Sequence, residues 1–212
     1  MRDSAPILVT GYGPFPGVEV NPSGRAVEML AQSPEKLATS RQVVFEVLPV
    51  SYRRTLPRLK ELLAAHRPAL TICVGVDNTA QTLKLETLAF NEFAQHATDV
   101  DGELPREVQV IPGGATQWEA RFDVDAAVAA LSDEARVGGP LPVTSSADAG
   151  RYLCNAALAV ITQEADERGE GATLFLHIPP AEIAPAELVG DLISELCAHE
   201  DWWGRPARNS KE

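Results

Sequence analysis

The chain alternates between short apolar runs and segments in which apolar residues recur every three or four positions. Unbroken runs of aliphatic residues predict buried strands, whereas the spacing of three and four predicts helices with one apolar face. On this pattern we expect strands at 7–10, 42–50, 69–75, 83–90, 108–111, 141–145 and 172–177. We expect helices over 22–33, 51–66, 124–131, 150–168 and 186–199.

Cap and turn residues refine these limits. Asn21 followed by Pro22 is typical of a helix start, because asparagine caps the first turn and proline fits the first helical position. Ser51 is predicted to cap the next helix. The polar and acidic segment 96–106 predicts an exposed loop, and the tail from Gly204 is expected to be frayed.

Strands that alternate with helices along the whole chain predict an α/β fold, with a mostly parallel sheet covered by helices on both faces. No long linker divides the 212 residues, so we expect one domain, 1–212. Ligands of such sheets gather at the carboxyl ends of the strands, where we expect Gly11, Gly75, Ser145 and His177.

Composition narrows the classes of function. A formal charge of −12 disfavours nucleic acid and anionic membranes as partners, because both require clustered Lys or Arg. No apolar stretch has the length of a membrane span or of a signal peptide. Three cysteines without a CxxC pair favour reduced thiols, hence the cytoplasm. No metal or phosphate-loop motif is present, so no cofactor and no metal are expected.

Cys154 is the candidate nucleophile. It follows a strand end and a small polar turn, at the opening of the helix predicted over 150–168. The free N–H groups and the positive end of a helix favour an anion there, and therefore a thiolate or an oxyanion. From position alone Cys154 is also compatible with simple packing, which is the interpretation for Cys73 within a strand and Cys197 on an amphipathic helix.

Two further residues, His177 and Glu86, complete a candidate catalytic set with Cys154. Among the four histidines, His177 alone closes an apolar run and would lie at the carboxyl end of a strand, where it can act as a base. Glu86 is a carboxylate inside an apolar extended stretch and can orient that histidine. A hydrogen-bonded core histidine and an edge-strand charge are the structural alternatives.

Five segments together resemble the pyroglutamyl-peptidase I family, also called pyrrolidone carboxyl peptidases. The resemblance covers about residues 7–185 and lies in 9–17 with Asn21-Pro22-Ser23, in 86–91, in Asp101-Gly102 with 112–114, in 149–155 and in 176–179. It implies an α/β/α sandwich and a cysteine peptidase with Glu86, Cys154 and His177 as its triad. The implied substrates are small peptides that begin with pyroglutamate, and a homo-oligomer is plausible.

The resemblance also implies a substrate pocket. Tyr12, Phe15 and Tyr152 match its apolar walls, and Asn21 would order the loop beside it. Two pocket positions depart from the family: Val76 begins a stretch in which the family has Gln and Arg, and His96 replaces an Arg.

The Pro179-Pro180-Ala181 segment, where a Tyr after the first proline is common, departs as well. These changes leave open a cysteine amidohydrolase of altered specificity. They also leave open a non-catalytic relative that binds a blocked peptide or a metabolite.

Overall fold

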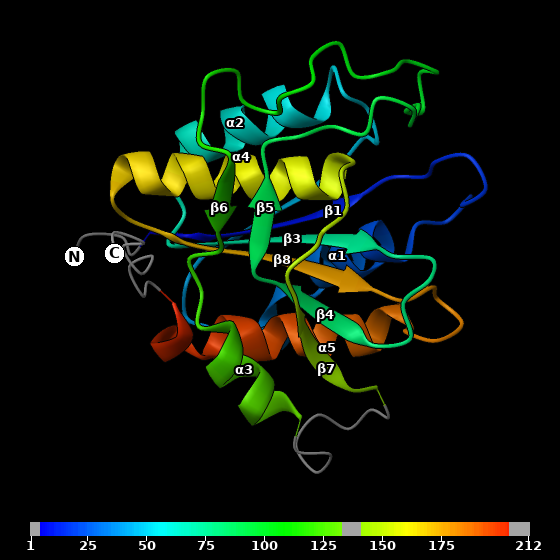
Figure 1. Cartoon of the computed structure of the whole chain (residues 1–212). Coiled ribbons are helices and arrows are strands. Elements are labelled where there is room, and N and C mark those ends of the chain that lie inside the picture. The colour runs from blue at the N-terminus through cyan, green and yellow to red at the C-terminus, as the bar shows by residue number, and fades with distance from the viewer. Residues whose placement is uncertain (1–4, 133–140, 204–212) are drawn as a thin grey trace.

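The computed structural model describes residues 5–132 and 141–203, which form a six-stranded sheet between layers of helices (Figure 1). The strand order is β2 (Val43–Leu48), β1 (Ile7–Tyr12), β3 (Leu70–Val76), β8 (Ala172–Ile178), β4 (Leu83–Glu86), β7 (Val143–Ser146). The first four are parallel, β4 runs antiparallel to β8, and β7 is parallel to β4. The expected mostly parallel, mixed α/β sandwich is confirmed.

Helices cover both faces of this sheet because successive side chains of each strand point to opposite faces. One face packs against α1 (Pro22–Gln32), α3 (Val124–Leu131) and α5 (Ala186–Ala198). The other packs against α2 (Thr55–His66) and α4 (Leu153–Arg168). Two short 3₁₀ helices, η1 (Pro34–Lys36) and η2 (Glu200–Trp202), complete the fold. The frayed tail expected from Gly204 lies outside the described residues.

The cap predictions have different outcomes. Asn21 caps α1 as predicted, since its side-chain oxygen accepts a hydrogen bond from the Ser23 N–H at 3.1 Å. Ser51 does not cap α2: that helix begins four residues later, and the Ser51 hydroxyl instead donates to Asp101 at 2.7 Å. The helix predicted from residue 150 begins at Leu153, after Gly150 takes a left-handed backbone conformation with φ of 75°.

Two strand predictions need correction. The stretch 83–90 forms β4 and then a separate strand, β5 (Leu88–Phe90), because the chain leaves the main sheet at Thr87. The partner of β5 is β6 (Gln117–Glu119), and segment 108–111 is not a strand. Backbone groups of segment 108–111 form individual hydrogen bonds and no strand ladder: the Val108 carbonyl accepts from the Phe93 N–H, and the Ile111 N–H donates to the Asn91 side chain.

The carboxyl ends of β1, β3 and β8 meet at one edge of the sheet, with Gly75 directly beside His177. Ser145 was expected at the same edge and is not there, because β7 runs in the opposite direction to β8. After β7 a connection leads to α4, the first turn of which lies over Gly75. No helix in the described residues has the length and apolarity needed to cross a membrane.

Candidate active site

The first turn of α4 places the Cys154 sulfur against the end of β3. A Cβ atom built on Gly75 would lie 2.9 Å from this sulfur and 2.8 Å from the Phe175 ring. Only glycine leaves that space, so the sequence of β3 permits the close approach. The side chain of Cys154 is half-buried, whereas Cys73 and Cys197 are buried. Burial raises the pKa of each of those two thiols to about 12, so neither is reactive at neutral pH.

Asn155 holds this helix start against the neighbouring chain. Its side-chain oxygen accepts from the Phe90 N–H at 2.7 Å, and its amide nitrogen donates to the carbonyls of Phe90 and Glu92 at 2.8 and 3.2 Å. Asn155 itself is fully buried, so its side chain needs these partners. The position of Cys154 is therefore fixed by its neighbour in sequence as well as by Gly75.

His177 and Glu86 form a buried pair beside this sulfur. The antiparallel register sets Lys84 directly opposite His177, and alternate residues share a face, so Glu86 lies diagonal to His177 on the same face. His177 Nδ1 lies 2.7 Å from Glu86 Oε1, and the two residues are 7% and 0% exposed. A carboxylate only accepts, so Nδ1 carries the proton and Nε2 is left to face the thiol.

The protonated form of His177 is favoured by two anions. Burial alone would lower the pKa of His177, but the charge of Cys154, a hydrogen bond with it, and the Glu86 carboxylate together raise it to about 10. The Cys154 sulfur lies over Gly75, which is the direct neighbour of His177 in the sheet, so the nucleophile candidate lies beside the histidine. The structure thus brings Glu86, His177 and Cys154 together at one edge of the sheet.

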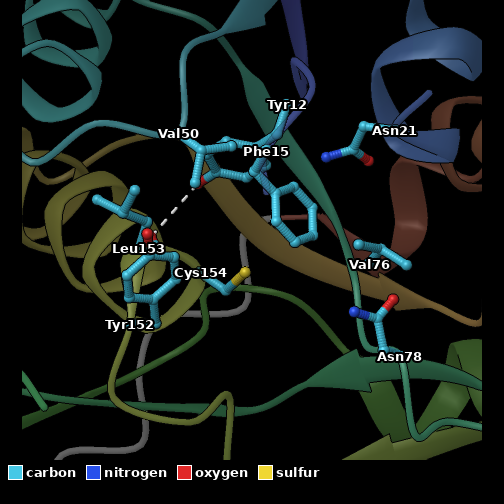
Figure 2. Close-up of a pocket in the computed structure, with 9 residues that line it drawn as sticks. All are labelled: Tyr12, Phe15, Asn21, Val50, Val76, Asn78, Tyr152, Leu153 and Cys154. Carbon is cyan, nitrogen blue, oxygen red and sulfur yellow. Dashed lines mark hydrogen bonds between the residues drawn. The ribbon is translucent and has the colours of Figure 1, made fainter. Parts of the chain in front are cut away.

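A cavity of about 170 Å³ opens beside the sulfur (Figure 2). It is smaller than the roughly 300–1,000 Å³ of pockets for drug-sized ligands, so it suits a small ring or side chain. Its walls come from the ends of β1 and β3, the loops after them, the chain after β2 and the start of α4. The lining residues are Tyr12, Phe15, Asn21, Val50, Val76, Asn78, Tyr152, Leu153 and Cys154.

Apart from Cys154, the walls of this cavity are uncharged. Burial, with the nearby charge of Cys154, raises the pKa of Tyr12 well above its ordinary value. Burial, with the charges of Asp99 and Cys154, raises the pKa of Tyr152 to about 12. Both hydroxyls therefore stay neutral at pH 7. No carboxylate lines the cavity to receive a free α-ammonium group, so the cavity favours a neutral group.

Three polar side chains of the walls are already engaged. The Tyr12 hydroxyl donates to the Leu153 carbonyl at 3.3 Å, and the Tyr152 hydroxyl donates to the Thr98 carbonyl at 3.1 Å. Asn21 donates to the Gly13 carbonyl at 3.0 Å while it caps α1. Asn21 therefore orders the loop after β1, as expected, in addition to lining the cavity.

Five of the six expected substrate-pocket residues line the cavity, and the sixth does not. His96 is exposed in its loop and is not among the residues that line the cavity. In that loop the buried Asp99 accepts hydrogen bonds from the backbone N–H groups of Tyr52 and Glu103.

Sequence reasoning did not select Val50, Asn78 and Leu153 as site residues. Val50 and Leu153 have apolar side chains, which do not mark a functional site in the sequence. Asn78 is an amide just after the carboxyl end of β3, and that position is a usable signal. Across residues 5–132 and 141–203, no group of three or more His, Cys, Asp or Glu side chains is arranged to hold a metal ion.

Comparison with known proteins agrees with the geometry. Residues 5–193 match the family model described as pyroglutamyl peptidase. The pyrrolidone-carboxylate peptidases of Thermococcus onnurineus and Thermococcus kodakarensis are 30% and 31% identical over 174 residues, which is 82% of this chain and 82% and 80% of theirs.

Among solved structures, the fold matches the pyrrolidone carboxyl peptidase of Fervidobacterium islandicum with a TM-score of 0.83, at 23% identity over 94% of this chain and 100% of that one. The enzyme of Thermococcus litoralis matches with a TM-score of 0.79, at 24% identity over 93% and 94% of the two chains. At these identities the structures establish a shared fold. On the family match and the curated relatives together, the chain belongs to the pyroglutamyl peptidase family.

Proposed function

We propose that this protein is a cysteine peptidase that removes an N-terminal pyroglutamyl residue from peptides. The observation that carries the proposal is the position of Cys154, which lines the uncharged cavity and whose sulfur lies over Gly75, the strand neighbour of His177 in the His177–Glu86 pair. A pyroglutamyl residue has a neutral five-membered ring and no ammonium group, and both properties suit this cavity. The names of the curated relatives support the same substrate class.

The chemistry follows from the contacts. His177 takes the thiol proton through Nε2, and the Cys154 sulfur attacks the carbonyl carbon of the pyroglutamyl residue. Glu86 keeps the imidazole in one orientation and stabilises its positive charge. Protonated His177 then gives its proton to the leaving amine as the C–N bond breaks, which leaves a thioester on Cys154. A water molecule, deprotonated by His177, hydrolyses the thioester and releases pyroglutamate.

The first turn of α4 supplies donors for the oxyanion. The first N–H groups of a helix have no partner within the helix, and the N-cap residue Tyr152 makes no side-chain capping bond to them. They are therefore free to bind the negative oxygen that forms next to Cys154.

The test is release of a fluorescent amine from a pyroglutamyl-amide by wild type and Cys154→Ala, with an alanyl-amide as the control substrate. We expect turnover of the pyroglutamyl-amide alone, reduced by at least about 10³-fold in Cys154→Ala. Equal turnover of both substrates would favour a less specific amidohydrolase. No turnover by the folded wild type would favour a binding protein.

The compartment and the assembly state complete the proposal. All three cysteines are free thiols, which favours a reducing compartment, and we assign the protein to the cytoplasm. The homo-oligomer implied by the family resemblance stays a prediction, and sedimentation velocity of the purified protein tests it.

A further inference from the structure

One amide on the cavity wall has no hydrogen-bond partner among the described residues. Asn78 lies on the cavity wall, its side chain is exposed, and it makes no hydrogen bond within the described residues. Figure 2 shows its amide at the opposite side of the cavity from Leu153, with the nitrogen directed toward the side of Cys154. Because the hydroxyls of Tyr12 and Tyr152 and the amide of Asn21 are engaged, Asn78 is the lining side chain with both a free donor and a free acceptor.

The backbone around Asn78 is held on both sides. Asp77 Oδ1 accepts hydrogen bonds from the Thr79 N–H at 2.9 Å and from its hydroxyl at 2.7 Å. Asp77 Oδ2 accepts from Lys84 Nζ at 2.8 Å, and the Asp77 N–H donates to the Ile178 carbonyl at 2.9 Å. The turn is therefore fixed while the side chain at its tip remains unpaired.

The ion pair between Asp77 and Lys84 in this turn persists at low pH. Although partial burial of Asp77 would raise its pKa, the hydrogen bonds from Lys84 and Thr79 lower it to about 2. Asp77 stays ionised at any pH at which the enzyme is assayed. The position of Asn78 is thus set in advance of binding, which reduces the entropy lost when a ligand is bound.

A carboxamide at this place matches the polar edge of a lactam. In a five-membered lactam the amide is cis, so its N–H donor and its C=O acceptor lie side by side on one edge. The Asn side chain presents an acceptor and a donor side by side as well. The two groups can form a pair of hydrogen bonds in one plane, with Oδ1 accepting from the lactam N–H and Nδ2 donating to the lactam oxygen.

We infer that Asn78 is the specificity-determining residue of this site and recognises the cis amide of the pyroglutamyl ring by this paired hydrogen bond. The inference rests on the proposed function, since it names how the proposed substrate is selected. It also gives a role to the segment that follows Val76. Val76 offers only an apolar wall, and Asn78, two residues later, provides the amide.

The test compares two substrates in two variants. The first is a pyroglutamyl-amide, and the second is the matched lactone-amide, in which oxygen replaces the ring N–H. Asn78→Ala is the variant, and Gln81→Ala is the matched control, because Gln81 is an exposed amide of the same connection outside the cavity wall. We expect Asn78→Ala to lower kcat/KM for the lactam by about 10- to 100-fold, mainly through KM, as two neutral hydrogen bonds are lost.

The lactone makes the result specific to the paired bond. The lactone lacks the ring N–H donor and can form only one of the two hydrogen bonds with Asn78. The loss of kcat/KM caused by Asn78→Ala should therefore be several-fold smaller for the lactone than for the lactam. Gln81→Ala should match wild type on both substrates. An equal loss of kcat/KM on lactam and lactone, or no loss on either, would overturn the inference. Turnover of the lactam by wild type would in that case still support the proposed peptidase function. If wild type does not turn over the lactam, the proposed function fails first.

Discussion

Nδ1 of His177 lies 2.7 Å from Oε1 of Glu86, and the two residues come from neighbouring strands that run in opposite directions. Glu86 is fully buried, and its second oxygen has no hydrogen-bond partner in the part of the chain that the structure describes. Within the described residues, His177 is thus the one side-chain hydrogen-bond partner of this carboxylate. A buried charge with a single partner is costly unless that partner is positively charged for part of the reaction cycle.

Replacing this carboxylate should therefore reduce activity without changing the cavity. We expect Glu86→Gln to lower kcat by about 10²- to 10⁴-fold, because an amide neither holds the same tautomer as firmly nor stabilises the imidazolium. Steady-state kinetics on the pyroglutamyl-amide provide the measurement. Glu187→Gln, an exposed glutamate without a contact in the described residues, is the control. A Glu86→Gln enzyme with wild-type kcat would remove Glu86 from the mechanism.

The protonation of His177 predicts a limit of activity at high pH. The pKa is raised from 6.5 to about 10, mainly by Cys154 against the opposing effect of burial. A raised pKa means that the proton is held below about pH 10, so kcat should fall as the pH rises through that value, when the leaving amine loses its proton donor. The stability that His177 contributes by holding this proton is complete below pH 6.5 and is lost over the same upper range.

The pKa of His177 can also be measured in the absence of substrate turnover. In Cys154→Ala the group that contributes most to raising the pKa of His177 is gone, so His177 should titrate at a lower pH than in wild type. Two-dimensional NMR of the imidazole nitrogens gives the titration curve of His177 in both proteins. An unchanged titration would mean that the sulfur and the ring do not interact.

Gly75 provides a test of how the sulfur is placed. A methyl group at this position would lie 2.9 Å from the Cys154 sulfur, closer than side chains tolerate, so Gly75→Ala should displace the sulfur. We expect kcat to fall by about 10²-fold and the free energy of unfolding to fall by about 1–3 kcal/mol.

Gly13→Ala is the matched control. The nearest atom to its added methyl group is 3.7 Å away, which is an ordinary contact. Kinetics and thermal unfolding of both variants check the prediction. Wild-type turnover by Gly75→Ala would contradict the argument for close approach.

The sequence predicted the class of fold and the proximity of the three proposed catalytic residues. Uninterrupted apolar runs identified β1, β3 and β8 well, because buried parallel strands have little choice of side chain. The direction of β4 and β7 was beyond prediction from one sequence, since it depends on pairing between segments that are distant in sequence: β4 pairs with β8, and β7 pairs with β4.

The corrections at 51 and 108–111, and the position of His96 outside the cavity wall, share a physical cause. Each lies where single side-chain hydrogen bonds, and not a regular backbone ladder, hold the chain: the Ser51 hydroxyl donates to Asp101, Asp99 accepts from the Tyr52 N–H, and Asn91 accepts from the Ile111 N–H. Such contacts leave no periodic pattern in the sequence. Asn78 was missed for a related reason, because an unpaired amide is recognised only when the neighbouring amides are seen to be engaged.

The last strand in the sequence occupies a central place in the sheet, between β3 and β4. A nascent chain that has emerged only as far as α4 therefore holds Glu86 and Cys154 but lacks β8, the element that joins β3 to β4 and carries His177. Its thiol has no histidine partner and its carboxylate has no counter-charge. Under the proposed mechanism, a chain truncated before His177 is therefore expected to be inactive even if its cavity walls are present.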